Sequence, residues 1–85
     1  MPNIEWTRRA ESEAFRLPAR ARADLFAVIA LLRANPEMFE MIQQGRYRGH
    51  RRAMIGRSHA MYYRVSGAER TCILVTIRNA RRRPV

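Results

Sequence analysis

The chain has 85 residues, which is enough for one domain with a small hydrophobic core. Its 47% hydrophobic content excludes a wholly disordered polymer, and no apolar run approaches the ~18 residues of a membrane span. The formal net charge is +10, and every basic residue is an arginine. We therefore expect a single domain over residues 1–85. The lone cysteine, Cys72, cannot form an internal disulfide, which favours the reducing cytoplasm.

The positive charge is concentrated in the second half of the chain. Residues 1–44 carry six arginines and six acidic residues, whereas residues 45–85 carry eleven arginines against Glu69 alone. Arginine keeps its charge at any physiological pH and presents a planar fork to phosphate or carboxylate groups. This asymmetry predicts an acidic partner, either a nucleic acid or an acidic protein.

The first half of the chain predicts a short strand followed by two helices. Residues 3–7 alternate apolar and polar side chains, and Thr7 is a suitable N-cap for a helix that ends at Leu17. Pro18 can begin a second helix, which Asn35 and Pro36 end. The second helix carries an apolar stripe at i, i+3, i+4 and i+7, made of Leu25, Val28, Ile29 and Leu32.

The second half predicts three strands. One further helical turn is expected within residues 36–44, before a pattern of period two over residues 47–55. Turns at residues 56–58 and 66–68 then separate strands over residues 59–65 and 71–78.

Short turns between these three strands predict an antiparallel meander with the strand at residues 59–65 in the centre. In the last strand we expect Ile73, Val75 and Ile77 to face one way and Leu74 the other. The predicted fold class is α+β, in the order βααβββ, with the helical hairpin covering the apolar face of the sheet.

Arginine and aromatic residues form the only chemical constellation that the sequence suggests. The two histidines and one cysteine are too widely spaced for a metal site, and no phosphate-binding glycine loop is present, so we expect no metal and no cofactor. The predicted strands and the residues next to them carry Arg51, Arg52, Arg57, Arg64, Arg78, Arg81, Arg82 and Arg83, with His50, His59, Tyr62 and Tyr63 among them. Three interpretations remain open: metal-free RNA cleavage, binding of an acidic partner without chemistry, and a solvated face.

Three short motifs resemble the RelE/ParE superfamily of toxins from type II toxin–antitoxin systems. They are Ile4-Glu5-Trp6-Thr7, Tyr62-Tyr63-Arg64-Val65, and Ile77-Arg78-Asn79-Ala80-Arg81-Arg82. Their order and spacing cover essentially the whole chain. The superfamily has two functional arms: RelE-like toxins cleave mRNA on the ribosome, and ParE-like toxins poison DNA gyrase.

The RelE-like pattern is only partly present. Arg51 and Arg81 match expected basic positions, but Ala53 and Ala60 replace two others, and no tyrosine follows the last predicted strand. In this alternative His50 or His59 would act as the acid or base.

The ParE-like pattern fits better. Residues 56–65 read Gly-x-Ser-His-x-x-Tyr-Tyr-Arg-Val, which is similar to a ParE-like strand, and Ala80-Arg81-Arg82 resembles the family's basic ending. The resemblance implies a non-enzymatic gyrase inhibitor. The target-binding residues that we predict are Arg57, Arg64, Arg81, Arg82 and Arg83.

The resemblance also implies a protein partner. A cognate antitoxin, acidic and partly disordered until bound, would place a helix on the helical hairpin and form a hetero-oligomer with the toxin. The predicted antitoxin contacts are Leu25, Ile29, Leu32 and Arg52. The alternative to gyrase as the target is the ribosome with its mRNA, and a third hypothesis is a non-toxic module that binds an acidic partner.

Overall fold

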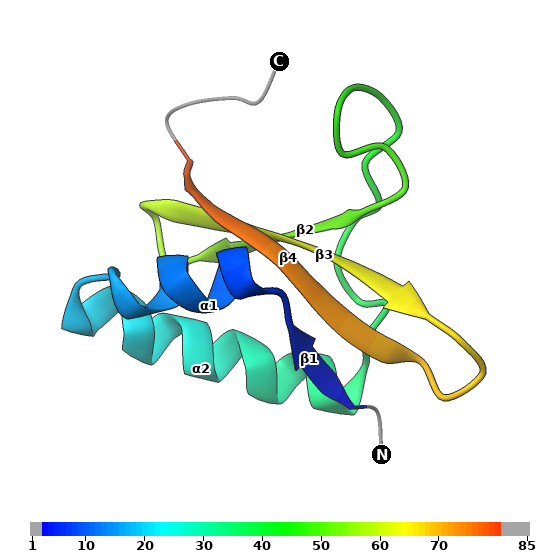
Figure 1. The fold of residues 1–85 in the computed structure, drawn as a ribbon, viewed down its shortest axis with the longest axis horizontal. Helices are drawn as coiled ribbons and strands as arrows, with labels where there is room; N and C mark the ends of the chain where they lie inside the picture. The colour runs from blue at the N-terminus through cyan, green and yellow to red at the C-terminus, as the bar shows by residue number, and fades with distance from the viewer. Residues whose placement is uncertain (1–2, 81–85) are drawn as a thin grey trace.

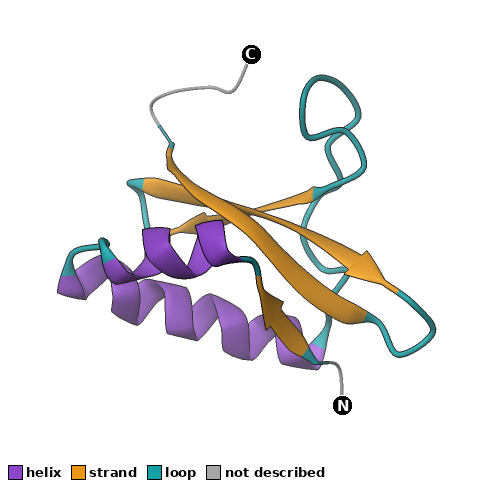
Figure 2. Cartoon of the chain, viewed as in Figure 1, coloured by secondary structure: helices purple, strands orange, loops and turns teal. Residues whose placement is uncertain are grey.

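The computed structural model describes residues 3–80 and places a four-stranded sheet over two helices (Figure 1). In chain order the elements are β1 (Ile4–Trp6), α1 (Arg8–Phe15), α2 (Ala19–Ala34), β2 (Arg51–Ile55), β3 (His59–Ser66) and β4 (Thr71–Asn79). Figure 2 shows both helices on the same side of the sheet. The predicted α+β class and the order βααβββ are therefore confirmed.

The sheet has the strand order β1-β4-β3-β2. Strands β2, β3 and β4 pair antiparallel as the predicted meander, which leaves β3 in a central position. The short strand β1 joins the other side of β4 in parallel, with Ile4 opposite Cys72 and Trp6 opposite Leu74. A parallel pair needs a long crossover connection, and α1, α2 and the first two meander strands, which lie between β1 and β4 in the chain, supply it.

Thr7 connects the start of α1 to the sheet. Its side-chain oxygen accepts a hydrogen bond from the Ala10 amide at 3.1 Å, as predicted for an N-cap, and its hydroxyl lies 2.9 Å from the Leu74 and Val75 carbonyl oxygens. Glu13, one turn further along α1, accepts hydrogen bonds from the Thr76 hydroxyl at 2.7 Å and the Ile77 amide at 3.1 Å. Beyond the end of β1, α1 therefore supplies the acceptor that a neighbouring strand would otherwise provide.

The core lies between the helices and one face of the sheet. Helix α2 turns its predicted apolar stripe toward β2, β3 and β4, and α1 contributes Ala10. The buried residues of the core are Ala10, Leu17, Ala21, Leu25, Val28, Ile29, Leu32, Ala53, Ile55, Met61, Tyr63, Cys72, Leu74 and Ile77. Within the described part of the chain, no helix is long and apolar enough to cross a membrane.

The segment between α2 and β2 differs from the prediction. Residues 36–44 form no helical turn, and β2 begins at Arg51 rather than at residue 47. The buried Tyr63 hydroxyl donates to the Pro36 carbonyl oxygen at 2.8 Å, and the Arg51 guanidinium donates to the Glu37 and Phe39 carbonyl oxygens at 3.1 and 2.7 Å. Backbone acceptors that a helix would use internally are thus bonded to side chains of β2 and β3.

Tyr63 occupies the centre of this arrangement. Its ring is fully buried and meets the Phe39 ring edge-on at 6.4 Å. Burial is the main cause that raises the pKa of Tyr63 to about 12, so the hydroxyl keeps the proton that it donates to Pro36. Burial likewise raises the pKa of the Cys72 thiol, which suits a structural residue of the core.

The prediction that Ile73, Val75 and Ile77 share one face of β4 was wrong. Cys72, Leu74 and Ile77 face the helices, while Ile73 and Val75 are only half-buried. The cause is a register shift between Tyr62 and Tyr63, which pairs them with Thr76 and Leu74 and leaves one extra residue on β4. A single inserted residue moves every later side chain to the other face of a strand.

Gly56, in the turn between β2 and β3, lies against α2 and offers a test of this packing. Its φ of +60° is costly for an L-residue, and a Cβ atom there would lie 2.5 Å from Oδ2 of Asp24. Gly67, in the turn before β4, has φ +77° but nothing within 4 Å of the equivalent position.

We expect Gly67→Ala to lower the unfolding free energy by about 1–2 kcal/mol. Gly56→Ala should lower it by a similar amount, because the atom that a new methyl group would crowd is the carboxylate end of the flexible Asp24 side chain, which can rotate away. Urea denaturation of both variants measures the difference. A loss more than about 1 kcal/mol larger in Gly56→Ala would show that the Asp24 carboxylate is held in place against the turn.

Candidate functional site

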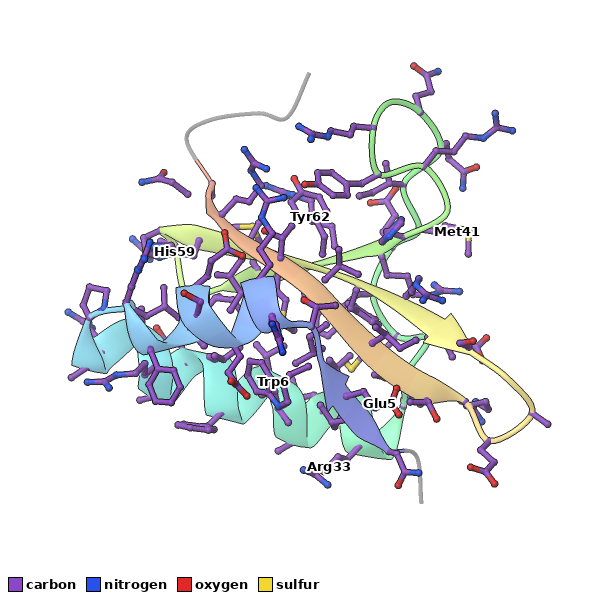
Figure 3. The ribbon with its side chains drawn as sticks, viewed as in Figure 1. Glu5, Trp6, Arg33, Met41, His59 and Tyr62 are labelled. Carbon is purple, nitrogen blue, oxygen red and sulfur yellow. The ribbon has the colours of Figure 1, made fainter. Side chains whose placement is uncertain are left out.

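The sheet face turned away from the helices, here called the open face, carries the candidate site. Side chains alternate along each strand, so Arg52 of β2 and Ala60 and Tyr62 of β3 point away from the core residues beside them. Tyr62 lies on the side of the sheet opposite to the helices in Figure 3. The loop before β2 and the end of β4 border this face (Figure 1).

A second, smaller cluster of buried residues is built on the open face. Tyr47, from the loop before β2, stacks on Tyr62 with ring centroids 4.4 Å apart and planes inclined by 17°. The His50 ring meets Tyr47 edge-on at 5.7 Å. The Arg78 guanidinium of β4 donates to the Tyr47 hydroxyl at 3.1 Å. Stacking and a charged hydrogen bond together hold the loop on the sheet.

A hollow of about 380 Å³ adjoins this cluster. It contains two arginines and no acidic residue, and its lining is Ile42, Gln44, Gly45, Arg46, Tyr47, Arg52, Tyr62 and Ala80. Beside it, the buried Nδ1 atom of His50 has no hydrogen-bond partner within residues 3–80. Such a surface suits an anionic group, because guanidinium groups pair with phosphate or carboxylate oxygens. No group of three His, Cys, Asp or Glu side chains that could hold a metal is found in the described part of the chain.

The predicted nuclease residues do not converge. The Arg51 guanidinium donates hydrogen bonds to the carbonyl oxygens of Glu37 and Phe39, so it stabilises the loop before β2. His50 precedes β2 and His59 pairs with its last residue, so they are roughly 17 Å apart along the strand. The His59 ring is instead hydrogen-bonded to the Ser58 hydroxyl at 2.7 Å. The fourth predicted residue, Arg81, lies outside the described residues.

The predicted target-binding arginines are spread over the surface. Arg57 is exposed in the turn before β3, and Arg64 is exposed near the end of that strand, roughly 20 Å away. Arg57 lines a hollow of about 770 Å³ with Arg20 and Asp24 of α2. The remaining predicted residues, Arg81, Arg82 and Arg83, lie outside the described residues. Any partner that contacts both Arg57 and Arg64 therefore has to cover the length of β3.

Three of the predicted antitoxin contacts are residues of the core. Leu25, Ile29 and Leu32 are buried in the core against the sheet, and Leu25 also lines the groove between the two helices. Arg52, the fourth, lies on the open face and lines the hollow there.

The hairpin instead exposes Phe15 and Phe26, whose side chains are 75% and 65% accessible. Both border an apolar groove of about 530 Å³ between α1 and α2, which is lined by Trp6, Glu11, Ala14, Phe15, Ala19, Arg22, Ala23, Leu25 and Phe26. Sequence reasoning missed this groove, although the position of Phe26 beside the apolar stripe is a signal for it.

The sequence from residue 4 to residue 84 matches the family model described as the ParE toxin of the type II toxin–antitoxin system parDE. The chain belongs to the ParE toxin family. It is thus a toxin of a type II toxin–antitoxin system and a member of the RelE/ParE superfamily, as the three sequence motifs predicted. No curated protein matches the chain by sequence.

Solved structures confirm the fold of this ParE-family chain. It is similar to a YoeB/ParE toxin from Agrobacterium tumefaciens, with a TM-score of 0.77, 21% identity, and coverage of 91% of this chain and 96% of that one. The isolated E. coli RelE toxin gives a TM-score of 0.81 at 13% identity, covering 98% and 88%. The chromosomal ParDE system from P. aeruginosa gives 0.67 at 16% identity, covering 93% and 96%. At these identities the similarity concerns the fold alone.

The structural role of Arg51 can be tested against its neighbour Arg52. Arg51→Gln removes two hydrogen bonds from a charged donor and should lower the unfolding free energy by about 1–3 kcal/mol. Arg52→Gln should change it by no more than about 0.5 kcal/mol, because its guanidinium makes no hydrogen bond within residues 3–80. Urea denaturation gives both values, and amide exchange should accelerate at residues 37–41 only in Arg51→Gln. Loss of toxicity with unchanged stability would contradict the structural assignment.

Proposed function

We propose that this ParE-family toxin arrests growth by inhibiting DNA gyrase, without catalysing a reaction itself. The observation that carries the proposal is the family match over residues 4–84, which includes the ParE-like strand at residues 56–65. The dispersal of Arg51, His50 and His59 adds support, because a nuclease needs its proton-transfer groups within hydrogen-bond reach of one substrate.

The target-binding surface that we propose runs along β3. Arg57 and Arg64 are exposed at its two ends, and Arg81, Arg82 and Arg83 follow β4 in sequence. Exposed arginines distributed over such a length suit a broad acidic surface on a large target better than a small-molecule pocket.

Gyrase inhibition is tested by titrating the purified toxin into a supercoiling reaction on relaxed plasmid. We expect loss of supercoiled product together with linear plasmid trapped by the enzyme. The variant Arg57→Gln/Arg64→Gln should require several-fold more toxin, because two charged groups are removed from the proposed surface. The matched control Arg9→Gln/Arg33→Gln removes the same charge from exposed positions of α1 and α2 and should behave like the parent chain. Unaffected gyrase at micromolar toxin would overturn the proposal.

Ribosome-dependent mRNA cleavage is the second candidate function. The open face favours it, since Arg46, Arg52, His50 and two tyrosines gather around one hollow there. Cleaved transcripts after expression of the toxin, with supercoiling intact in the gyrase assay, would move the assignment to this function. Intact mRNA during growth arrest would remove it.

We propose that the cognate antitoxin docks in the apolar groove of the helical hairpin. Phe15 and Phe26 expose most of their surface there, and Trp6 and Ala14 form part of the wall between them. An amphipathic helix is the occupant that such a groove fits, with its apolar side chains against the phenylalanines. Arg22 at the same groove would pair with the acidic side chains expected of an antitoxin.

Phe26→Asp tests this docking site. Removing one aromatic side chain from the interface should weaken antitoxin binding by about 10- to 100-fold, since burial of such a side chain contributes about 1.5–3 kcal/mol. Isothermal titration with the antitoxin measures the change in affinity, and toxicity should persist in cells that express both proteins. Leu31→Asp is the control, because Leu31 is 47% exposed on the same helix but does not line the groove. Equal weakening in both variants would show that the antitoxin does not use the groove.

A further inference from the structure

The loop before β2 projects from the sheet, and two backbone hydrogen bonds close it at its base. The Ile42 amide donates to the His50 carbonyl oxygen at 2.8 Å, and the Gly49 amide donates to the Ile42 carbonyl oxygen at 2.9 Å. These two bonds close a neck, so residues 43–48 project from it as a compact loop, here called the basic loop (Figure 1). Gly45 and Gly49 have φ of +87° and +86°, a backbone region in which side chains are disfavoured, and they allow the chain to reverse there.

One side chain of the basic loop is buried. Tyr47 is 8% exposed, whereas residues 43–46 and Arg48 are exposed. Stacking on Tyr62 and the hydrogen bond from Arg78 attach Tyr47 to two strands. Because Arg46 and Arg48 flank this anchor, the backbone positions of both arginines are set by the sheet.

Within residues 3–80, Arg46 and Arg48 have no carboxylate partner. The ion pair in this part of the chain joins Arg70 and Glu37, which lie outside the basic loop. Arg46 has its Cζ atom 6.0 Å from the centroid of the Tyr47 ring, and Arg52 lines the hollow next to it. A rigid loop thus presents guanidinium groups above a face that contains further arginines and no acid at the hollow.

We propose that the basic loop binds the phosphodiester backbone of a nucleic acid, with Arg46 and Arg48 as the contacting residues and Tyr47 as the positioning residue. This interaction goes beyond the proposed function, because it requires neither gyrase nor the antitoxin. Guanidinium groups spaced along a projecting loop match a regularly charged polymer. This contact depends on the charge and spacing of the phosphate groups, so it does not distinguish one base sequence from another.

An acidic peptide fits this position less well. A peptide gains most of its affinity on a sheet by adding a strand to a free edge. At this end of β2 the edge is occupied by the chain itself, since the Arg52 amide donates to the Glu40 carbonyl oxygen at 3.1 Å and Met41 pairs with Arg51. A phosphate backbone, by contrast, needs no free strand edge, because it can bind through the Arg46 and Arg48 side chains alone.

Fluorescence anisotropy with the purified chain tests the proposal. The probes are a labelled duplex DNA of about 20 base pairs, a single-stranded RNA of the same length, and a labelled polyglutamate peptide, each titrated over a range of salt. The variant is Arg46→Gln/Arg48→Gln, and the matched control is Arg9→Gln/Arg33→Gln, which removes the same charge from the helices. Figure 3 shows Arg33 on the far side of the helical layer from the open face.

We expect the loop variant to reduce the slope of log K against log salt by about 2, one unit for each phosphate that the missing arginines would neutralise. The control should keep the parent slope on duplex DNA or RNA, and whichever probe binds more tightly identifies the backbone. Identical slopes for the loop variant and the control would overturn the proposal. Tighter binding of polyglutamate than of either nucleic acid, abolished in the loop variant, would overturn it in favour of an acidic protein.

Tyr47 has its own test. Tyr47→Ala removes the stacking on Tyr62 and should weaken nucleic-acid binding as much as the removal of both arginines, although the charge is unchanged. Tyr47→Phe keeps the stacking and should restore most of the affinity. Thermal unfolding identifies any variant that fails to fold, and the exposed arginines keep the proposal testable in that case. Parent affinity in a folded Tyr47→Ala chain would overturn the positioning role.

Discussion

The covering of one sheet face by α2 is the constraint on which the rest of this structure depends. Eighty-five residues provide one hydrophobic core, and Leu25, Ile29 and Leu32 fill it together with Tyr63 and the other inward side chains of the meander. Because the helices cover a single face, the other face of the sheet stays available for function. The asymmetric charge of the sequence follows the same division, since the arginine-rich second half of the chain supplies β2, β3, β4 and the loop before β2.

Tyr63 connects this core to the shape of the surface. Its buried hydroxyl holds the Pro36 carbonyl, and Arg51 on the neighbouring strand holds the carbonyls of Glu37 and Phe39. The chain therefore leaves α2 as a non-helical segment bound to the sheet, and it reaches the open face before β2 starts. The position of the basic loop is thus a consequence of core packing, although the loop itself contributes little to the core.

The structure separates the surfaces that we propose for the antitoxin and for the target. The apolar groove with Phe15 and Phe26 lies on the helical hairpin, whereas the stacked Tyr47 and Tyr62 lie on the opposite side of the sheet. If an antitoxin occupies the groove and a target occupies β3 or the open face, neutralisation requires either a longer antitoxin segment that wraps around the sheet or a change in the toxin on binding. Arg52, predicted from the sequence as an antitoxin contact, lies on that open face.

The sequence by itself determined the element order, the caps and the family. Thr7 as N-cap, Asn35 as the helix end and the turns on either side of residues 59–65 are local signals, because each depends on hydrogen bonds or backbone conformation within a few residues. Only the tertiary structure decided which apolar residues form the core and which a partner can reach. Leu25 and Phe26 are equally apolar neighbours, and burial against the sheet is what separates them. The same physical reason explains three wrong predictions. They concern the start of β2, the conformation of residues 36–44 and the register of β4. Tyr62, Tyr63 and Arg51 determine them through contacts with residues about 10 or more positions away in the chain.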